Sequence, residues 1–143
     1  MLKTQLLHPD ILRVLATSGH GAAVLIADGN YPFGTLANPA AERVYLNLAP
    51  GLVTVTHVLE TLLTAIPVEA AHVMLKDGGI EPEIFADFRR LVGAAAPDVE
   101  LMPLERYAFY DKAQQPNVAL VVATGEQRLF ANIILTIGVV HPA

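Results

Sequence analysis

The sequence predicts a single three-layer α/β/α domain over residues 1–143, built on a largely parallel or mixed sheet. The length of 143 residues suits one domain of ordinary size. Six apolar runs have the length of strands and are continuous rather than alternating, which indicates strands covered on both faces. Segments with helical periodicity lie between most of these runs, and this alternation is typical of layered α/β domains.

The expected elements follow from apolar spacing and from the prolines and glycines that bound it. In chain order, we expect a helix over 8–19, strands over 22–28 and 43–49, a helix over 55–66, a strand over 71–75, a helix over 84–92, a strand over 99–102, a helix over 104–115, and strands over 118–124 and 132–140. The first helix has Pro9 in its first turn and Gly19 as its stop. Pro103 and Pro116 bound the fourth helix.

Composition excludes several classes of protein. Apolar residues make up 53% of the chain and charged residues 16%, so part of the apolar excess is expected between subunits. The net charge is −5 and the nine Lys and Arg residues are scattered, which argues against nucleic acid as a partner. There is no cysteine, no run long enough to span a membrane and no recognisable secretory signal. We therefore expect a soluble cytoplasmic protein without a membrane partner.

The segment "LIADGNYP" (25–32) carries an apolar run into Asp28, Gly29 and Asn30. In open α/β sheets, polar groups at the carboxyl ends of strands line the usual ligand crevice, so Asp28 is a candidate binding residue. The same three residue types also favour turns without any function. Both interpretations stay open on the residues alone.

His20 lies between two glycines in "SGHGAAV", just before a predicted strand. The segment is not a dinucleotide fingerprint, because that motif follows a strand, opens a helix and needs a third glycine. His20 is either a helix-end histidine favoured by the helix dipole or a functional imidazole. A strand of about seven residues spans roughly 20 Å or more, so His20 and Asp28 meet only through chain curvature or across subunits.

No metal site is expected from the remaining histidines. Histidines 8, 57, 72 and 141 have no convincing partner at ligand spacing. His57 and Glu60 are three residues apart on a predicted helix, a pair more typical of a solvated face than of a coordination sphere.

Four segments together resemble the D-ribose pyranase and L-fucose mutarotase family over nearly the whole chain. They are "GHG" at 19–21, "ADGNYP" at 27–32, "ERYAFYDKAQ" at 105–114, and "TGE" at 124–126 followed by "FAN" at 130–132. Each is weak alone, but their order and spacing are specific. "ERYAFYDKAQ" and the asparagine after "ADG" are closer to the fucose mutarotase branch.

The resemblance implies a catalyst of sugar ring opening and reclosure without cofactor or metal. His20 matches the family's histidine acid, and Asp28 matches a sugar-binding carboxylate. Arg106 matches the basic position of the fucose branch, and Asn132 ends a Tyr-Ala-Asn or Tyr-Gly-Asn motif. The partner would be a monosaccharide, and the site would lie between subunits of a ring-like homo-oligomer, a decamer.

One departure from the family concerns Phe130, which stands where the family usually has tyrosine. Its ring can stack on a sugar, but it lacks the phenolic hydroxyl, and Tyr31 or Tyr110 is a hypothetical replacement. Three functions remain open: a mutarotase for L-fucose or a related aldose, a D-ribose pyranase-type enzyme that exchanges ring size, and a sugar-binding accessory or regulatory protein without catalysis.

Overall fold

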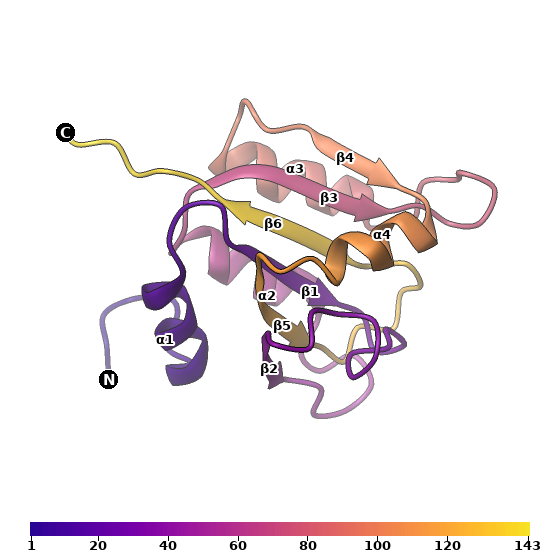
Figure 1. Cartoon of the computed structure of the whole chain (residues 1–143), viewed down its shortest axis with the longest axis horizontal. Helices are drawn as coiled ribbons and strands as arrows, with labels where there is room; N and C mark the ends of the chain where they lie inside the picture. The colour runs from indigo at the N-terminus through magenta and orange to yellow at the C-terminus, as the bar shows by residue number, and fades with distance from the viewer.

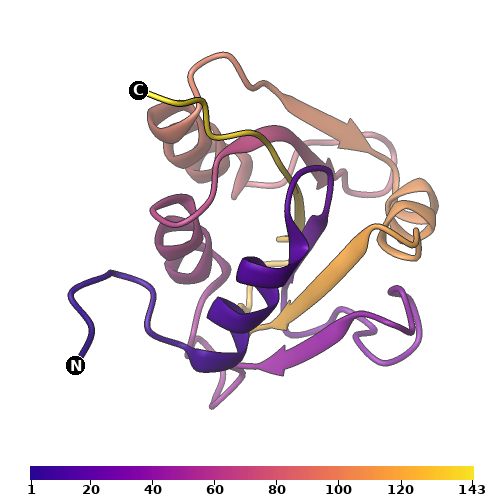
Figure 2. The same cartoon turned by 60° about the vertical axis from the view of Figure 1, so that its left-hand side comes forward.

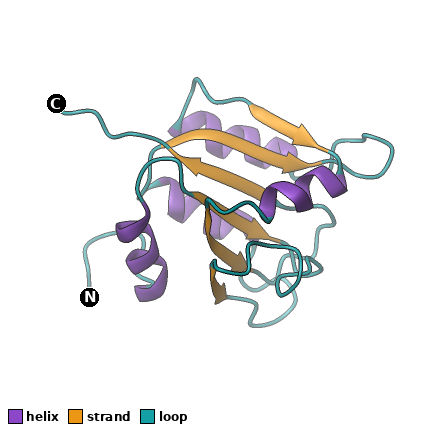
Figure 3. Cartoon of the chain, in the orientation of Figure 1, coloured by secondary structure: helices purple, strands orange, loops and turns teal.

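The structure, a computed structural model, describes residues 1–143 and contains the helices and strands expected from the sequence (Figure 1). In chain order these are α1 (Pro9–Ser18), β1 (Ala23–Ala27), β2 (Glu42–Tyr45), α2 (Val55–Leu63), β3 (Val68–Met74), α3 (Phe85–Ala95), β4 (Leu101–Leu104), α4 (Arg106–Ala113), β5 (Val118–Ala123) and β6 (Ile133–Ile137). Between β1 and β2 the chain forms only loops and turns (Figure 3). None of the helices combines the length and the apolar character needed to cross a lipid bilayer.

All strands belong to one sheet, in the order β2-β5-β1-β6-β3-β4. β6 runs antiparallel to both of its neighbours, β1 and β3, whereas every other neighbouring pair is parallel. At the centre, Leu25 of β1 lies beside Val121 of β5 and Ile134 of β6. The sheet is therefore mixed. Because β6 is reversed, it begins at the edge of the sheet where β1 and β5 end.

The sheet is covered on both faces, which confirms the three-layer prediction. Val24 and Ile26 of β1 pack in the larger core with residues of α1, α2 and α3. Leu25 and Ala27 point to the opposite face, where they pack with Phe109 of α4. Figure 2 shows α2 and α3 on one side of the sheet and α4 on the other. All of β1 is buried, as its uninterrupted apolar run predicts.

Several element boundaries differ from the sequence prediction: the strand expected over 43–49 ends at Tyr45 as β2, and the strand expected over 71–75 begins earlier, at Val68, as β3. The helix expected to stop near Gly93 continues to Ala95, because one glycine near a helix end costs only about 1 kcal/mol. The strand expected over 99–102 runs through Pro103 to Leu104 as β4. Proline is tolerated there because β4 is an edge strand, so its missing N–H removes no ladder hydrogen bond inside the sheet.

Replacing Gly125 with alanine is expected to lower the free energy of unfolding by about 3 kcal/mol, because the added methyl group would collide with backbone. A Cβ at this position would overlap the carbonyl oxygens of Ala49 and Leu52, which cannot move away as a side chain would. Urea unfolding would measure the loss. Gly34→Ala is the control, since a Cβ there meets nothing within 4 Å. Equal stability of the two variants would contradict the prediction.

Candidate functional site

Asp28 and Asn132 lie together at the carboxyl edge of β1, although they are far apart in the sequence. Asp28 follows the last residue of β1, and Asn132 precedes the first residue of the reversed strand β6. The backbone N–H of Asp28 donates to Asn132 Oδ1 at 2.8 Å, and Asn132 Nδ2 donates to Asp28 Oδ2 at 3.1 Å. Both residues are buried: Asp28 is 3% exposed and Asn132 is 3% exposed. This reciprocal pair fixes both groups.

The "DGN" segment is a turn, and the turn also holds the carboxylate. Asn30 N donates to Asp28 Oδ1 at 2.9 Å, and Tyr31 N donates to the Asp28 carbonyl at 3.1 Å. Gly29 N donates to the Glu126 carbonyl, and a Cβ on Gly29 would lie 3.1 Å from that same oxygen. The close approach of the two loops explains the glycine. The two sequence interpretations of this segment are therefore compatible.

Burial raises the pKa of the Asp28 carboxyl, and its hydrogen bonds only partly offset that effect. The donors that act against burial include the N–H groups of Asn30 and Ala131 and the amide of Asn132. Ala131 N donates to Asp28 Oδ2 at 3.1 Å. Asp28 is thus a preorganised acceptor that takes up a proton at a higher pH than an ordinary aspartate.

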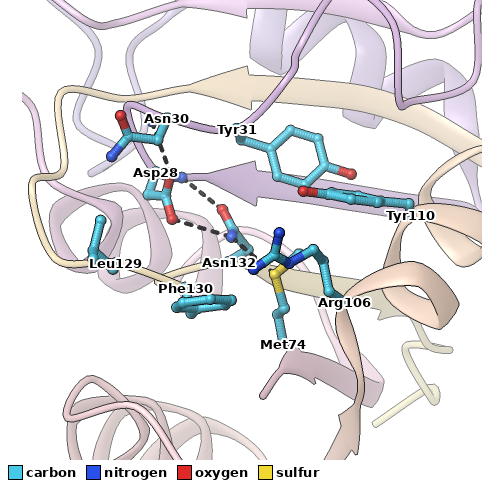
Figure 4. Close-up of a pocket in the computed structure, with 9 residues that line it drawn as sticks. All are labelled: Asp28, Asn30, Tyr31, Met74, Arg106, Tyr110, Leu129, Phe130 and Asn132. Atoms are coloured by element: carbon cyan, nitrogen blue, oxygen red, sulfur yellow. Dashed lines mark hydrogen bonds between the residues drawn. The ribbon is translucent and has the colours of Figure 1, made fainter. Parts of the chain in front are cut away.

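A cavity of about 210 Å³ opens beside this pair (Figure 4). It is lined by the four binding residues predicted from the sequence, Asp28, Arg106, Phe130 and Asn132. Two further lining residues, Tyr31 and Tyr110, are the tyrosines suggested from the sequence as replacements for the missing phenol, whereas Asn30, Met74 and Leu129 were not predicted. Met74 is the last residue of β3 and is buried in the apolar cluster that contains Phe109, so it belongs to the core and to the cavity wall at once. The cavity joins polar groups on one side to apolar surfaces on the other, as small-molecule sites commonly do.

Arg106 is the first residue of α4, and the helix start directs it to the cavity. The Glu105 side chain caps the helix by accepting a hydrogen bond from Ala108 N at 2.8 Å. The Arg106 guanidinium pairs with Asp77 at 2.6 Å and lies 5.4 Å from the centre of the Phe130 ring. The ring contact has cation–π geometry. Arg106 keeps donors for further oxygen atoms, because a guanidinium carries five N–H groups.

The two tyrosines proposed as substitutes for the missing phenol differ in their availability. Tyr31 is buried, and its hydroxyl donates to the Leu36 carbonyl at 2.7 Å. Tyr110 lines the cavity and packs edge to face with Tyr31, with ring centres 5.6 Å apart. Figure 4 shows both tyrosines across the cavity from Phe130. Tyr110 is therefore the better candidate, because the Tyr31 proton is already engaged.

The structure does not bring His20 to the cavity of its own chain. His20 precedes β1 and Asp28 follows it, so the five-residue strand separates them by roughly 17 Å at about 3.3 Å per residue. The His20 side chain is 58% exposed, and its Nε2 lies 2.8 Å from Glu69 Oε2. It lines a different, open groove of about 640 Å³ at the amino edge of β1. Within one chain His20 and Asp28 do not form a common site, and the role of His20 stays a prediction.

The remaining histidines do not form a metal site. No group of three or more His, Cys, Asp or Glu side chains lies in a geometry that could hold a metal ion. His57 instead caps α2: its Nδ1 accepts from Thr54 N, and its own N–H donates to Thr54 Oγ1. Burial lowers the pKa of His72 to about 4, with a smaller contribution from Lys112.

Comparison with known proteins finds relatives and solved structures that are similar to this chain over most of their length. The chain is 33% identical over 147 residues to fucose mutarotase of Danio rerio, covering 95% of this chain and 91% of that protein. The crystal structure of the Streptococcus pneumoniae fucose mutarotase in complex with L-fucose matches with a TM-score of 0.83 and 27% identity, covering 99% of this chain and 100% of that one. Bacillus subtilis RbsD complexed with D-ribose matches with a TM-score of 0.78 and 24% identity, covering 99% of this chain and 100% of that one.

The family assignment extends over almost the whole sequence. The model of the RbsD / FucU transport protein family matches residues 1–140. The match includes all four motif segments and every residue predicted for the site. The resemblance inferred from the motifs is thus confirmed. The chain belongs to the RbsD / FucU transport protein family.

Proposed function

We propose that this protein is a sugar mutarotase that interconverts the anomers of L-fucose or a related aldose. The observation that carries this proposal is the buried Asp28–Asn132 pair at the base of the cavity, facing Arg106 and Phe130. Asp28 accepts hydrogen bonds from sugar hydroxyls, Asn132 donates or accepts, and Arg106 donates. Phe130 offers an apolar face to the sugar ring. Relatives named fucose mutarotase at 33% identity support the same activity.

Mutarotation needs two balanced proton transfers. A base removes the proton of the anomeric hydroxyl while an acid protonates the ring oxygen, which breaks the bond between that oxygen and the anomeric carbon. The open aldehyde rotates, and reclosure on its other face reverses both transfers. An imidazole suits this cycle because it titrates near neutral pH and so both gives and takes a proton. His20 fills that role in the proposal.

A neighbouring subunit supplies His20 to each cavity. The exposed imidazole at the amino edge of the sheet and the cavity at the carboxyl edge suit a head-to-tail contact, in which one edge of a chain meets the other edge of the next. Head-to-tail contacts close into rings when the rotation allows it. This agrees with the ring-like homo-oligomer, a decamer, that the family resemblance implies.

The cytoplasmic location expected from the sequence also stays a prediction.

Saturation-transfer NMR of anomer exchange tests the proposal. Wild type, His20→Ala and a protein-free control would be compared on L-fucose, D-ribose, D-galactose and D-glucose. Acceleration by wild type that is lost in His20→Ala supports the mutarotase, and the sugar with the largest acceleration identifies the substrate. A site with fixed polar partners should discriminate sharply among them. If no sugar is accelerated but binding is detected, the non-catalytic accessory protein replaces the enzyme as the function.

The D-ribose pyranase-type activity is distinguished in the same spectra. Pyranose and furanose forms of D-ribose give separate anomeric signals, so transfer between them reports ring-size exchange directly. The match to RbsD at 24% identity supports the shared fold alone. Exchange of ring forms in D-ribose that exceeds anomer exchange in L-fucose would favour the pyranase.

Phe130→Tyr is expected to raise kcat/KM for the preferred sugar about tenfold, because it restores the phenolic hydroxyl usual in the family. Tyr110→Phe is expected to lower kcat/KM by a similar factor if Tyr110 has taken over that contact. Steady-state mutarotation kinetics would measure both, with Tyr45→Phe as the control because Tyr45 is exposed and outside the cavity. Unchanged kinetics in Phe130→Tyr would show that the sugar does not use this position.

Sugar binding is expected to weaken in acid with a midpoint above pH 3.8, the ordinary value for an aspartate. Burial raises the pKa of Asp28, so the carboxylate is protonated at a higher pH as acid is added and then loses acceptor capacity. Affinity measured by NMR titration between about pH 7 and pH 3 would define the midpoint. The acid limb should disappear in Asp28→Asn. A midpoint at or below pH 3.8 would contradict the prediction.

A further inference from the structure

The loop of residues 124–132 forms one wall of the cavity. Arg128, a residue of this loop that does not line the cavity, fixes the loop through its side chain. Arg128 Nε and Nη2 donate to Glu126 Oε1 and Oε2 at 3.0 and 2.9 Å, a bidentate pair. Arg128 Nη1 donates to Asp87 Oδ2 of α3 at 2.9 Å. The Arg128 guanidinium therefore joins two residues of the loop, Arg128 and Glu126, and also joins the loop to α3, which does not line the cavity.

The network is more than a surface ion pair. Glu126 is 4% exposed, so its carboxylate depends on Arg128 for a counter-charge. Burial acts to raise the pKa of Glu126, but the hydrogen bonds and charge of Arg128 outweigh it and the pKa is lowered. Hydrogen bonding to Arg128 is also the main reason that the pKa of Asp87 is lowered. Both acids are held in the charged form that binds the guanidinium.

Phe130 lies between two anchors of this loop. On one side stands Arg128, and on the other Ala131 N donates to Asp28 Oδ2 at 3.1 Å. Between them Phe130 has φ of 60°, the left-handed region that a bulky residue rarely adopts. Such a conformation persists only where the surroundings impose it. The two anchors impose it here, and it directs the ring toward the cavity and Arg106.

We propose that Arg128 is a positioning residue for sugar binding, which holds Phe130 in its cavity-facing conformation through Glu126 and Asp87. The proposal rests on the mutarotase function for its kinetic consequence. Arg128 does not line the cavity, so it acts on the sugar only through Phe130. Loss of the network releases the aromatic wall while Asp28, Asn132 and Arg106 keep their places. KM rises and kcat changes little, the pattern of lost ground-state binding.

Arg128→Lys is the first test variant, because it keeps one positive charge beside Glu126 but cannot form the three-armed contact. The double variant Arg128→Met with Glu126→Gln is the second, since it leaves no unpaired buried charge. Arg90→Met is the matched control: Arg90 pairs with the same Asp87 at 3.2 Å but is exposed and has no contact with the loop. We expect KM to rise about tenfold in both Arg128 variants and to stay unchanged in Arg90→Met, with kcat within about twofold.

A purely structural role for Arg128 gives a different result. Partial unfolding would lower the active fraction, so kcat would fall in step with the melting transition while KM stayed constant. That outcome, or unchanged kinetics in both Arg128 variants, would overturn the proposal.

A second readout does not depend on activity. In protein labelled only at phenylalanine, the Phe130 ring signal is assigned by its loss in Phe130→Leu. We expect that signal to shift in Arg128→Lys and to stay in place in Arg90→Met. If wild type accelerates no sugar, the mutarotase function fails, and the ring signal still decides whether Arg128 positions Phe130. An unmoved signal in Arg128→Lys would overturn the positioning role whatever the kinetics.

Discussion

His20→Ala is expected to reduce mutarotation by about 10²- to 10⁴-fold, the usual contribution of a positioned general acid or base. The fold should be unaffected, because the His20 side chain is 58% exposed and its contact within the chain is the surface pair with Glu69. Anomer exchange by NMR and thermal unfolding would be measured on the same samples. His141→Ala, which removes an exposed histidine near the carboxyl terminus, is the control and should keep full activity.

Mixed oligomers test whether His20 acts on its own chain or on a neighbour. His20→Ala and Asp28→Ala chains would be coexpressed with two different tags and purified through both. Random mixing is expected to restore about one quarter of wild-type turnover, because one cavity in four would then combine an intact Asp28 with a neighbour's intact His20. If His20 served its own cavity, every cavity would lack one of the two residues, and the mixture would be no more active than either variant.

Asn132→Asp is expected to destabilise the protein by about 3 kcal/mol at pH 7 and to abolish sugar binding. The amide that now donates to Asp28 Oδ2 at 3.1 Å would become a second buried carboxylate facing the first. Like charges at that distance raise the pKa of one of the two. The folded state then binds more protons than the unfolded state, so stability should recover as the pH falls from 7 to 5.

Asn117→Asp is the matched control for this substitution. Asn117 is exposed, and its Nδ2 donates to the Gly21 carbonyl at 3.0 Å, so the new carboxylate stays in water. Urea unfolding at pH 7 and pH 5 should show a loss of about 1 kcal/mol or less for Asn117→Asp. A similar loss in both variants, or no recovery of Asn132→Asp in acid, would show that Asp28 and Asn132 are not coupled as the structure indicates.

Apolar runs and helical periodicity were enough to predict the strands and the first three helices, because β1 and β5 are buried on both faces and α1, α2 and α3 each bury one face. The fourth helix was predicted from the prolines that bound it. The place of β6 between β1 and β3 was not predictable from them. A buried strand has the same apolar run in either direction, and strand order depends on pairing between distant segments. Asp28 was predictable from its place after a strand, whereas its partner Asn132 was predicted only through the family motif.

Other parts of the site could not be predicted from local sequence. Met74 ends an apolar strand and looks the same whether it fills a core or a cavity wall. The network of Glu126, Arg128 and Asp87 joins a loop to a distant helix, and nothing in the local spacing of these residues indicates that contact. Long-range polar contacts depend on the tertiary fold, which one sequence read locally does not supply.

The reversed direction of β6 has a consequence for the thermodynamics of ligand capture. β5 ends and β6 begins at the same edge of the sheet, so the connection that carries Phe130 is tethered to the sheet at both ends. Hydrogen bonds of Ala131 and Asn132 to the Asp28 carboxylate hold it further. A wall fixed in this way has little conformational entropy left to lose when a sugar enters. Binding should therefore show a small entropic penalty from the protein, and discrimination among sugars would come from the match of hydroxyl groups to a frame that is already ordered.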